Sequence, residues 1–142
     1  MEEYYKKFPD KFKKVLLEKK VIFPDSLEKD YEPFAAYRGI RLIPHIKDRV
    51  EKEDFRSQIE RASDFPGIDY EDIENYSCSC FIDIDELLLA FRLPRKNKGI
   101  ARGNIRKEYG PICREEESSH INWFLFNDAD PSSEFEVIKN EE

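Results

Sequence analysis

The stretch YSCSCFIDIDELLLAF, residues 76–91, decides the class of fold, because a strand pattern passes directly into a helix pattern within it. In its first part, residues 76–82, serines alternate with cysteines, so the two kinds of side chain would lie on opposite faces of a strand. Asp83 then begins a helix, since Glu86 three residues later completes a capping box and apolar residues continue to Phe91. The stretch therefore predicts a domain that mixes α and β structure.

The segments on the N-terminal side of this stretch predict two further helices and one strand. A helix with an apolar stripe is expected over residues 9–20, and a proline soon after it favours its termination there. Residues 33–43 are predicted to form an apolar strand, and residues 54–62 fit a second helix. The predicted helices therefore all lie in the N-terminal two-thirds of the chain.

The segments on the C-terminal side predict strands alone, over residues 100–106, 120–126 and 134–138. Because this half is richer in strands than in helices, we expect the strands to pair antiparallel. A length of 142 residues is typical of one domain. The sequence thus predicts a single α+β domain over residues 1–142, with a mostly antiparallel sheet, about three helices, and frayed ends at residues 1–8 and 139–142.

The composition disfavours several classes of partner. A net charge of −7 disfavours binding to a DNA duplex, which depends on concentrated lysine and arginine. No run approaches 18 apolar residues, so no membrane span is expected, and the N-terminus lacks the apolar segment of a secretory signal. Three cysteines without an export signal are expected to be reduced thiols. We therefore expect a cytoplasmic protein.

Basic residues nevertheless gather in one part of the chain, between Arg92 and Arg106. One hypothesis is that they bind a phosphate-bearing or nucleotide ligand without any catalytic glutamate. The other is that they form a solvated turn between two elements, as most charge runs do. The cluster comprises Arg92, Arg95, Lys96, Lys98, Arg102 and Arg106.

Cysteine and histidine offer two further hypotheses, since the chain has no GxxxxGK[ST], GxGxxG or HExxH motif. Cys78, Cys80, Cys113 and His120 are four potential zinc ligands, but C-x-C within an apolar-flanked strand is typical of small buried core residues instead. A cysteine nucleophile paired with His45 or His120 is the second hypothesis. Each histidine lies beside a proline or in an apolar strand, which favours a structural role, and we expect no metal.

Three short motifs in a fixed order point to a specific chemistry. The first is YRG at residues 37–39, an arginine inside an apolar strand. The second is SCS at residues 77–79, and the third is EFE at residues 134–136, which leads into an apolar strand. In this combination the sequence resembles the arginine–serine–glutamate class of ADP-ribosyltransferases, which cleave NAD⁺ and transfer ADP-ribose.

The resemblance implies a role for each matching residue. Arg38 would anchor the dinucleotide through a planar guanidinium that binds phosphate oxygens. Ser77 would support the nicotinamide-side ribose, and Ser79 would line the same cleft, since it shares a strand face with Ser77. Glu136 would stabilise the positive charge that develops on the ribose as nicotinamide leaves, while Glu134 would position the acceptor. The resemblance therefore implies NAD as the substrate and a cleft on which Arg38, Ser77 and Glu136 converge.

The motifs depart from the family pattern at residue 78, where a cysteine replaces the usual threonine. A second class of function is therefore open: a non-catalytic, acidic module that binds another protein through aromatic anchors. Trp123, Tyr4 and Tyr5 are the candidate anchors; the alternative is a core position for Trp123 and a frayed helix start for the two tyrosines. This alternative predicts a large exposed apolar patch and no polar pocket around Arg38.

Overall fold

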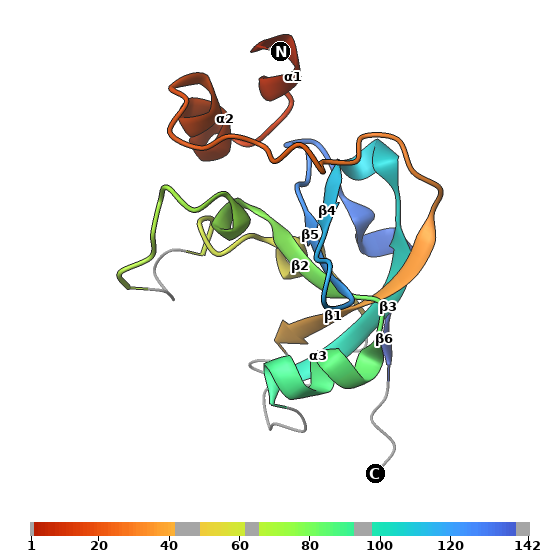
Figure 1. Cartoon of the computed structure of the whole chain (residues 1–142). Helices are drawn as coiled ribbons and strands as arrows, with labels where there is room; N and C mark the ends of the chain where they lie inside the picture. Colours follow the sequence, from red (N-terminus) through yellow and green to blue (C-terminus); the bar gives the residue numbers. More distant parts are fainter. Residues whose placement is uncertain (1, 42–48, 62–65, 93–97, 139–142) are drawn as a thin grey trace.

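The fold is built on a six-stranded sheet in which every described pairing is antiparallel. The computed structural model describes residues 2–41, 49–61, 66–92 and 98–138. The strands lie in the order β4-β5-β2-β1-β3-β6 (Figure 1). Their bounds are β1 Phe34–Arg41, β2 Cys78–Phe81, β3 Lys98–Ile105, β4 Ile112–Arg114, β5 His120–Trp123 and β6 Phe135–Ile138.

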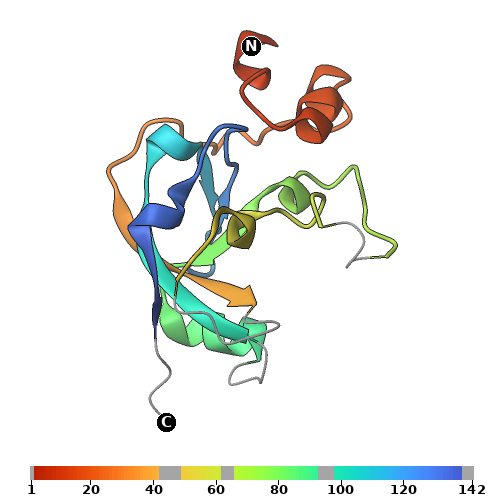
Figure 2. The same ribbon diagram turned by 180° about the vertical axis from the view of Figure 1, so that it is seen from behind.

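Within the described ranges, three α-helices lie at the two ends of this sheet, and both ribbon views show their places (Figure 1, Figure 2). The helices α1 (Glu2–Tyr5) and α2 (Asp10–Leu17) lie beyond one end, and α3 (Ile84–Phe91) packs near the other. Short 3₁₀ helices connect the strands, namely η1 Lys52–Phe55, η3 Ile73–Tyr76, η4 Lys107–Tyr109 and η5 Pro131–Glu134. The prediction of an α+β domain with a mostly antiparallel sheet and helices in the N-terminal two-thirds is therefore confirmed. None of the helices in the described ranges has the length and apolar character needed to cross a membrane.

The register of β2 against β5 separates two sets of side chains. Cys78 pairs with Trp123, and these side chains face the core. Ser79 pairs with Asn122, and Phe81 pairs with His120, on the other face. The predicted alternation of serine and cysteine is therefore confirmed, with both cysteines on the core face of β2 and Ser79 and Phe81 on the other.

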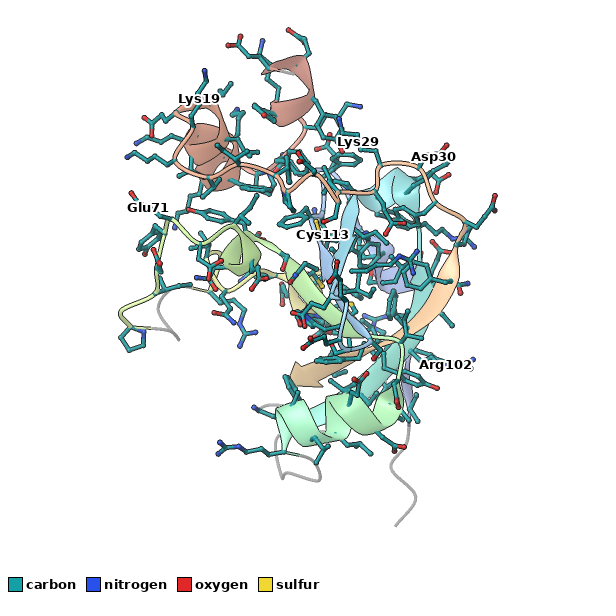
Figure 3. All side chains as sticks on the ribbon, in the orientation of Figure 1. Lys19, Lys29, Asp30, Glu71, Arg102 and Cys113 are labelled. Carbon is teal, nitrogen blue, oxygen red and sulfur yellow. The ribbon has the colours of Figure 1, made fainter. Side chains whose placement is uncertain are left out.

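Two apolar clusters hold the structure together. The first lies on the core face of the sheet and surrounds Trp123, which is fully buried, together with Phe55 of η1. The second packs α2 against η3 and β4, and within it the Phe12 ring stacks on the Tyr76 ring with centroids 4.9 Å apart. Cys113 belongs to the second cluster and lies among the crowded side chains between α2 and the sheet (Figure 3). Burial raises the pKa of its thiol to about 11.

The predicted helix over residues 54–62 is wrong within the part that the structure describes. A 3₁₀ helix ends at Phe55, and the carbonyls of Asp54 and Arg56 accept hydrogen bonds from a side chain of β1 instead of from helical amides. The amide of Ile59 likewise donates to Asn75 O at 3.1 Å. Long-range partners therefore take the carbonyls of Asp54 and Arg56 and the amide of Ile59, while Arg61 N keeps a local bond to Ser57 O at 3.2 Å. Residue 62 lies outside the described residues.

Smaller corrections concern the ends of other elements. Asp83 caps α3 by accepting from the amide of Asp85, but Glu86 accepts from the amide of Ser119 at 2.8 Å, so no capping box forms. The strand predicted over residues 120–126 ends at Trp123, because the amide of Phe124 bonds to Pro111 O outside the sheet. The short elements α1 and β4 were not predicted.

Candidate functional site

Arg38 lies at the point where the neighbouring strands β1 and β2 separate. Strands β1 and β2 pair only at Tyr37 and Phe81, whereas β1 pairs with β3 along its whole length. The Arg38 guanidinium fills the gap and donates from Nη1 to Ser79 O at 2.6 Å. It also donates from Nε to Asp54 O at 2.8 Å and from Nη2 to Arg56 O at 3.2 Å. Arg38 therefore fixes β2 and the segment after η1 to β1, and two of its five N–H donors remain for other partners.

A cleft of about 640 Å³ lies beside this gap, within the size range of small-molecule sites. Its apolar wall includes Leu87 and Phe91 of α3. Its polar wall comes from both strands around the gap, from β5 and from residues 53–61 and 74–77. The polar residues of the cleft include Arg38, Glu53, Arg56, Gln58, Glu74, Ser77, Ser79, His120 and Asn122.

Within this cleft, Ser79 and His120 form the first part of a hydrogen-bonded chain. Ser79 Oγ contacts His120 Nε2, and His120 Nδ1 lies 2.7 Å from Glu115 Oε1. The hydrogen bond with His120 holds the pKa of the Glu115 carboxyl below its ordinary value. Because an ionised carboxylate can only accept, Nδ1 carries the proton and Nε2 is left to accept from the serine hydroxyl. The three groups are therefore arranged as a nucleophile, a base and a group that orients the base.

Strand pairing explains why these groups meet. His120 opens β5 beside Phe81 of β2, and its ring lies 4.9 Å from the Phe81 ring. Glu115 follows β4, and its amide donates to His120 O at 3.1 Å, so the turn between β4 and β5 brings carboxylate and imidazole together. The side chain of His120 is 17% exposed and that of Glu115 is 45% exposed. The hydrogen-bonded series therefore leads from the half-exposed Glu115 to Ser79 in the cleft.

Ser77 is buried at the inner end of the cleft, where it has a structural contact on each side. Its Oγ lies 2.7 Å from Glu74 O and 2.9 Å from the side-chain oxygen of Asn122. One hydroxyl proton serves only one of these acceptors, and turning the Asn122 amide would let its NH₂ group donate to Ser77 instead. Ser77 therefore orients Asn122, which pairs with Ser79 across the strands.

The glutamates of the EFE motif do not lie in this cleft. Glu136 belongs to the edge strand β6 and pairs with Arg102, whereas Arg38 pairs with Ala101. Since neighbouring positions of a strand face opposite ways, Glu136 and Arg38 project from opposite faces of the sheet. Figure 3 shows Arg102, the partner of Glu136, at the outer side of the sheet.

Glu134 lies in η5, not in a strand, and forms an ion pair with Arg106. The structure thus brings Arg38, Ser77 and Ser79 together in one cleft, as expected, but places Glu134 and Glu136 elsewhere. The predicted convergence of Arg38, Ser77 and Glu136 is therefore wrong. The physical reason is the strand order, which puts β6 two strands away from β1 on the far side from β2.

Other candidates from the sequence take structural positions. Trp123 is fully buried, which favours its core alternative over a role as an exposed anchor. Tyr4 is half-buried and packs edge-on against Phe8 with ring centroids 5.5 Å apart, and Tyr5 packs against Phe23. The polar cleft beside Arg38 is also not what the interaction module predicts.

The four potential zinc ligands do not surround one point. Cys78 and Cys80 face the core, whereas His120 and Cys113 lie on the face of Phe81 and Asn122, their cross-strand partners. Across residues 2–41, 49–61, 66–92 and 98–138, no group of three or more histidine, cysteine or acidic side chains is arranged to hold a metal ion.

The described members of the basic cluster extend from the end of α3 to the end of β3. Lys98 lines the cleft, Arg102 lies over the Tyr37 ring at 5.9 Å, and Arg106 pairs with Glu134. Arg92 ends α3 in the left-handed conformation. Arg95 and Lys96 lie outside the described residues.

The pairing of Ser79 with His120 was not predicted from the sequence, although both residues were considered separately. Glu115 belongs to none of the motifs that the sequence predicts to be functional. The available signal was the short polar segment EEESS between the two halves of a β-hairpin, which brings Glu115 back toward His120. The register of β2 against β5, which brings Ser79 near His120, does not follow from any local sequence pattern.

Comparison with known proteins returned no match among protein-family models, curated proteins or solved structures. The function of the cleft is therefore inferred from the positions and chemistry of its own residues.

Proposed function

We propose that the chain is a serine hydrolase or acyltransferase whose nucleophile is Ser79. The observation that carries this proposal is the hydrogen-bonded series from Ser79 Oγ to His120 Nε2 and from His120 Nδ1 to Glu115 Oε1, at the wall of a cleft. A serine hydroxyl is a weak nucleophile until an adjacent base accepts its proton. A series of this kind is recognised by geometry and role on unrelated folds, not by position in the sequence.

In the proposed reaction Ser79 Oγ attacks the carbonyl carbon of an ester or amide in the cleft, and its proton moves to His120 Nε2. The bond to the leaving group breaks as His120 returns that proton to it, which leaves an acyl group on Ser79. Water or another hydroxyl then attacks the acyl group by the reverse path. Glu115 keeps the imidazole in the tautomer whose Nε2 accepts, and stabilises its charged form.

The remaining groups of the cleft have supporting roles. Arg38 bonds the carbonyl of Ser79 itself, so it positions the nucleophile from behind the strand. Arg56 and Gln58 line the cleft with N–H donors that are suited to stabilise the negative oxygen of the tetrahedral intermediate. Phe91 and Leu87 provide an apolar wall for the acyl or leaving group.

A fluorophosphonate probe tests the proposal without knowledge of the substrate, because it phosphonylates an activated serine and releases fluoride. We expect the full-length protein to gain one probe molecule, and peptide mapping to place it on Ser79. Ser79→Ala is expected to abolish labelling. His120→Ala is expected to slow it by about 10²–10⁴-fold, the usual contribution of a general base. Intact-mass spectrometry against time gives the rate.

Ser133→Ala is the matched control, since Ser133 is an exposed serine of η5 outside the cleft. It is expected to label at the wild-type rate. Labelling that persists in Ser79→Ala, or that is equal in wild type and His120→Ala, would remove the basis of the proposal. Circular dichroism of each variant ensures that the comparison is between folded proteins.

Glu115→Gln tests the third member of the series. We expect labelling to slow by about 10- to 100-fold, because the amide can present its NH₂ group to Nδ1 and thereby favour the tautomer with a protonated Nε2. The loss should be smaller than that of His120→Ala, since Glu115 is half-exposed and water can partly replace it. Glu116→Gln, a change at the neighbouring exposed residue, should have no effect. Equal rates for both variants would show that Glu115 does not orient the base.

NAD⁺ is a second candidate ligand of the same cleft. It is favoured by one observation: Arg38, Ser77 and Ser79, three of the residues that resemble the ADP-ribosyltransferase site, line this cleft together. Glu136 does not, so a different carboxylate would have to stabilise the ribose, and Glu53 and Glu74 are the glutamates of the cleft. Nicotinamide release from NAD⁺ that is lost in Glu74→Gln or Glu53→Gln, but kept in Glu136→Gln, would favour this candidate over the hydrolase.

A further inference from the structure

Two thiols flank Ser79 on the opposite face of its strand. Cys78 is 2% exposed and Cys80 is fully buried, and both belong to the core cluster. They are two residues apart in β2, so their side chains project from the same face of the sheet. All three cysteines of the described structure are free thiols, and the third, Cys113, lies on the other face of the sheet in the second cluster. Cys78 and Cys80 therefore form an isolated pair.

The surroundings of this pair favour a thiolate at Cys78 and a protonated thiol at Cys80. Arg38 projects from β1 toward the core face, and its positive charge favours the ionised form of both cysteines. Burial acts against ionisation of Cys78, but the hydrogen bond from Cys80 and the Arg38 charge outweigh it, so the pKa of Cys78 lies below its ordinary value. The pKa of Cys80 is well above its ordinary value, because its hydrogen bond to Cys78 and burial both hold its proton. Cys78 is also the member of the pair that lines a cavity, so position and charge both favour it as the nucleophile.

A small oxidant has a route to Cys78. The residue lines a second cavity of about 330 Å³, between the segment of Phe55 and Arg56 and the chain around Phe126. A water molecule occupies about 30 Å³ of liquid, and hydrogen peroxide is only slightly larger, so the cavity admits it. Cys80 and Cys113 do not line this cavity.

We propose that Cys78 and Cys80 are a peroxide-oxidisable dithiol whose disulfide displaces Ser79. In the first step the Cys78 thiolate attacks one oxygen of hydrogen peroxide, the O–O bond breaks, and a sulfenic acid forms with loss of hydroxide, which takes up a proton as water. In the second step Cys80 sulfur attacks Cys78 sulfur and expels a second water. Two thiols thus lose two electrons and two protons, and one peroxide becomes two waters.

The disulfide is incompatible with an extended β2. Residues two apart in a strand are separated by about 6.6 Å along the chain, whereas the Cβ atoms of a disulfide lie about 3.8 Å apart. Closing this distance bends the backbone at Ser79, the residue between the two cysteines. The bend disturbs the pairing of Ser79 with Asn122 and the bond from Arg38 to Ser79 O, so the hydroxyl leaves His120. This consequence for activity rests on the proposed function of Ser79, whereas formation of the disulfide does not.

Oxidation of the full-length protein with hydrogen peroxide, followed by alkylation and peptide mapping, tests disulfide formation. We expect the reduced protein to take up three alkyl groups and the oxidised protein one, on Cys113. The peptide that contains residues 78–80 should lose the mass of two hydrogen atoms, and dithiothreitol should restore it. In Cys80→Ala, dimedone should trap a sulfenic acid at Cys78. Oxidation of Cys113 with Cys78 and Cys80 still reduced would overturn the proposal.

Two readouts then report the consequence for the strand. Fluorescence of Trp123, the single tryptophan and the cross-strand partner of Cys78, should change on oxidation whether or not Ser79 is a nucleophile. The rate of fluorophosphonate labelling should fall at least tenfold and recover with dithiothreitol. A disulfide with unchanged fluorescence and unchanged labelling would overturn the claim that β2 bends. If even the reduced protein does not label, the proposed function fails while the mass and fluorescence results still decide the dithiol.

Discussion

Arg38→Met is expected to lower the free energy of unfolding by about 3–5 kcal/mol, one of the two largest effects expected of a single substitution in this chain. The methionine fills a similar volume but leaves the carbonyls of Asp54, Arg56 and Ser79 without their donors. Arg38 is 8% exposed, so water replaces these donors poorly. For a chain of this length the loss corresponds to a fall of roughly 10 °C in the melting temperature. Urea unfolding followed by circular dichroism measures it.

Arg102→Met is the matched control, since Arg102 lies on the neighbouring strand, is exposed, and contacts mainly the ring of Tyr37. It is expected to lose less than about 1 kcal/mol, the usual size of an exposed cation–π contact. Arg38→Lys should fall between the two, because one ammonium cannot reach three carbonyls in a plane. If Arg38→Met and Arg102→Met are equally stable, Arg38 does not fix the separated strands, and the cleft needs another explanation.

The same arginine shows how far sequence reasoning reaches in this protein. Its place inside an apolar strand was evident, and so was the shared face of Ser77 and Ser79, because strand periodicity is a local property. A bidentate role toward a phosphate was the expected chemistry for Arg38. The structure shows instead that three backbone carbonyls take its donors, two of them from a segment expected to be helical. A helix prediction assumes that backbone groups bond to residues four positions away, so it does not foresee that a side chain from another strand donates to Asp54 O and Arg56 O.

The site depends on strand order and register, which local patterns do not specify. The sequence predicts the strand that contains Glu136, but this strand, β6, lies at the edge of the sheet and pairs with β3. His120 was expected in a strand as well, and its strand pairs with β2, which puts it beside the SCS motif. Whether a polar strand residue meets Ser79 therefore follows from which strand is its neighbour. Ser79 and His120 are more than 40 positions apart in the chain, so their contact depends on long-range strand pairing, which local patterns do not specify.

Gly110→Ala is expected to lower the free energy of unfolding by about 2–4 kcal/mol. Gly110 has a φ angle of 150°, where a residue with a side chain is strained, and an added Cβ would lie 2.1 Å from Phe124 O. That oxygen belongs to the backbone, so relief requires the chain after β5 to move. The movement would also disturb the bond from the Tyr31 hydroxyl to Gly110 O, 2.8 Å long, and the bond from Phe124 N to Pro111 O, 2.9 Å long.

Gly67→Ala isolates the backbone part of this effect. Gly67 has a positive φ of 81°, but an added Cβ would meet nothing within 4 Å, so only conformational strain of about 1 kcal/mol is expected. Urea unfolding measures the loss of unfolding free energy in each variant. The difference between the two losses is the cost of the steric clash between the Cβ at residue 110 and Phe124 O. If the two variants lose the same free energy, the chain after β5 moves away at no cost. In that case the segment that carries Phe124 from the sheet into the second apolar cluster is not held as the structure implies.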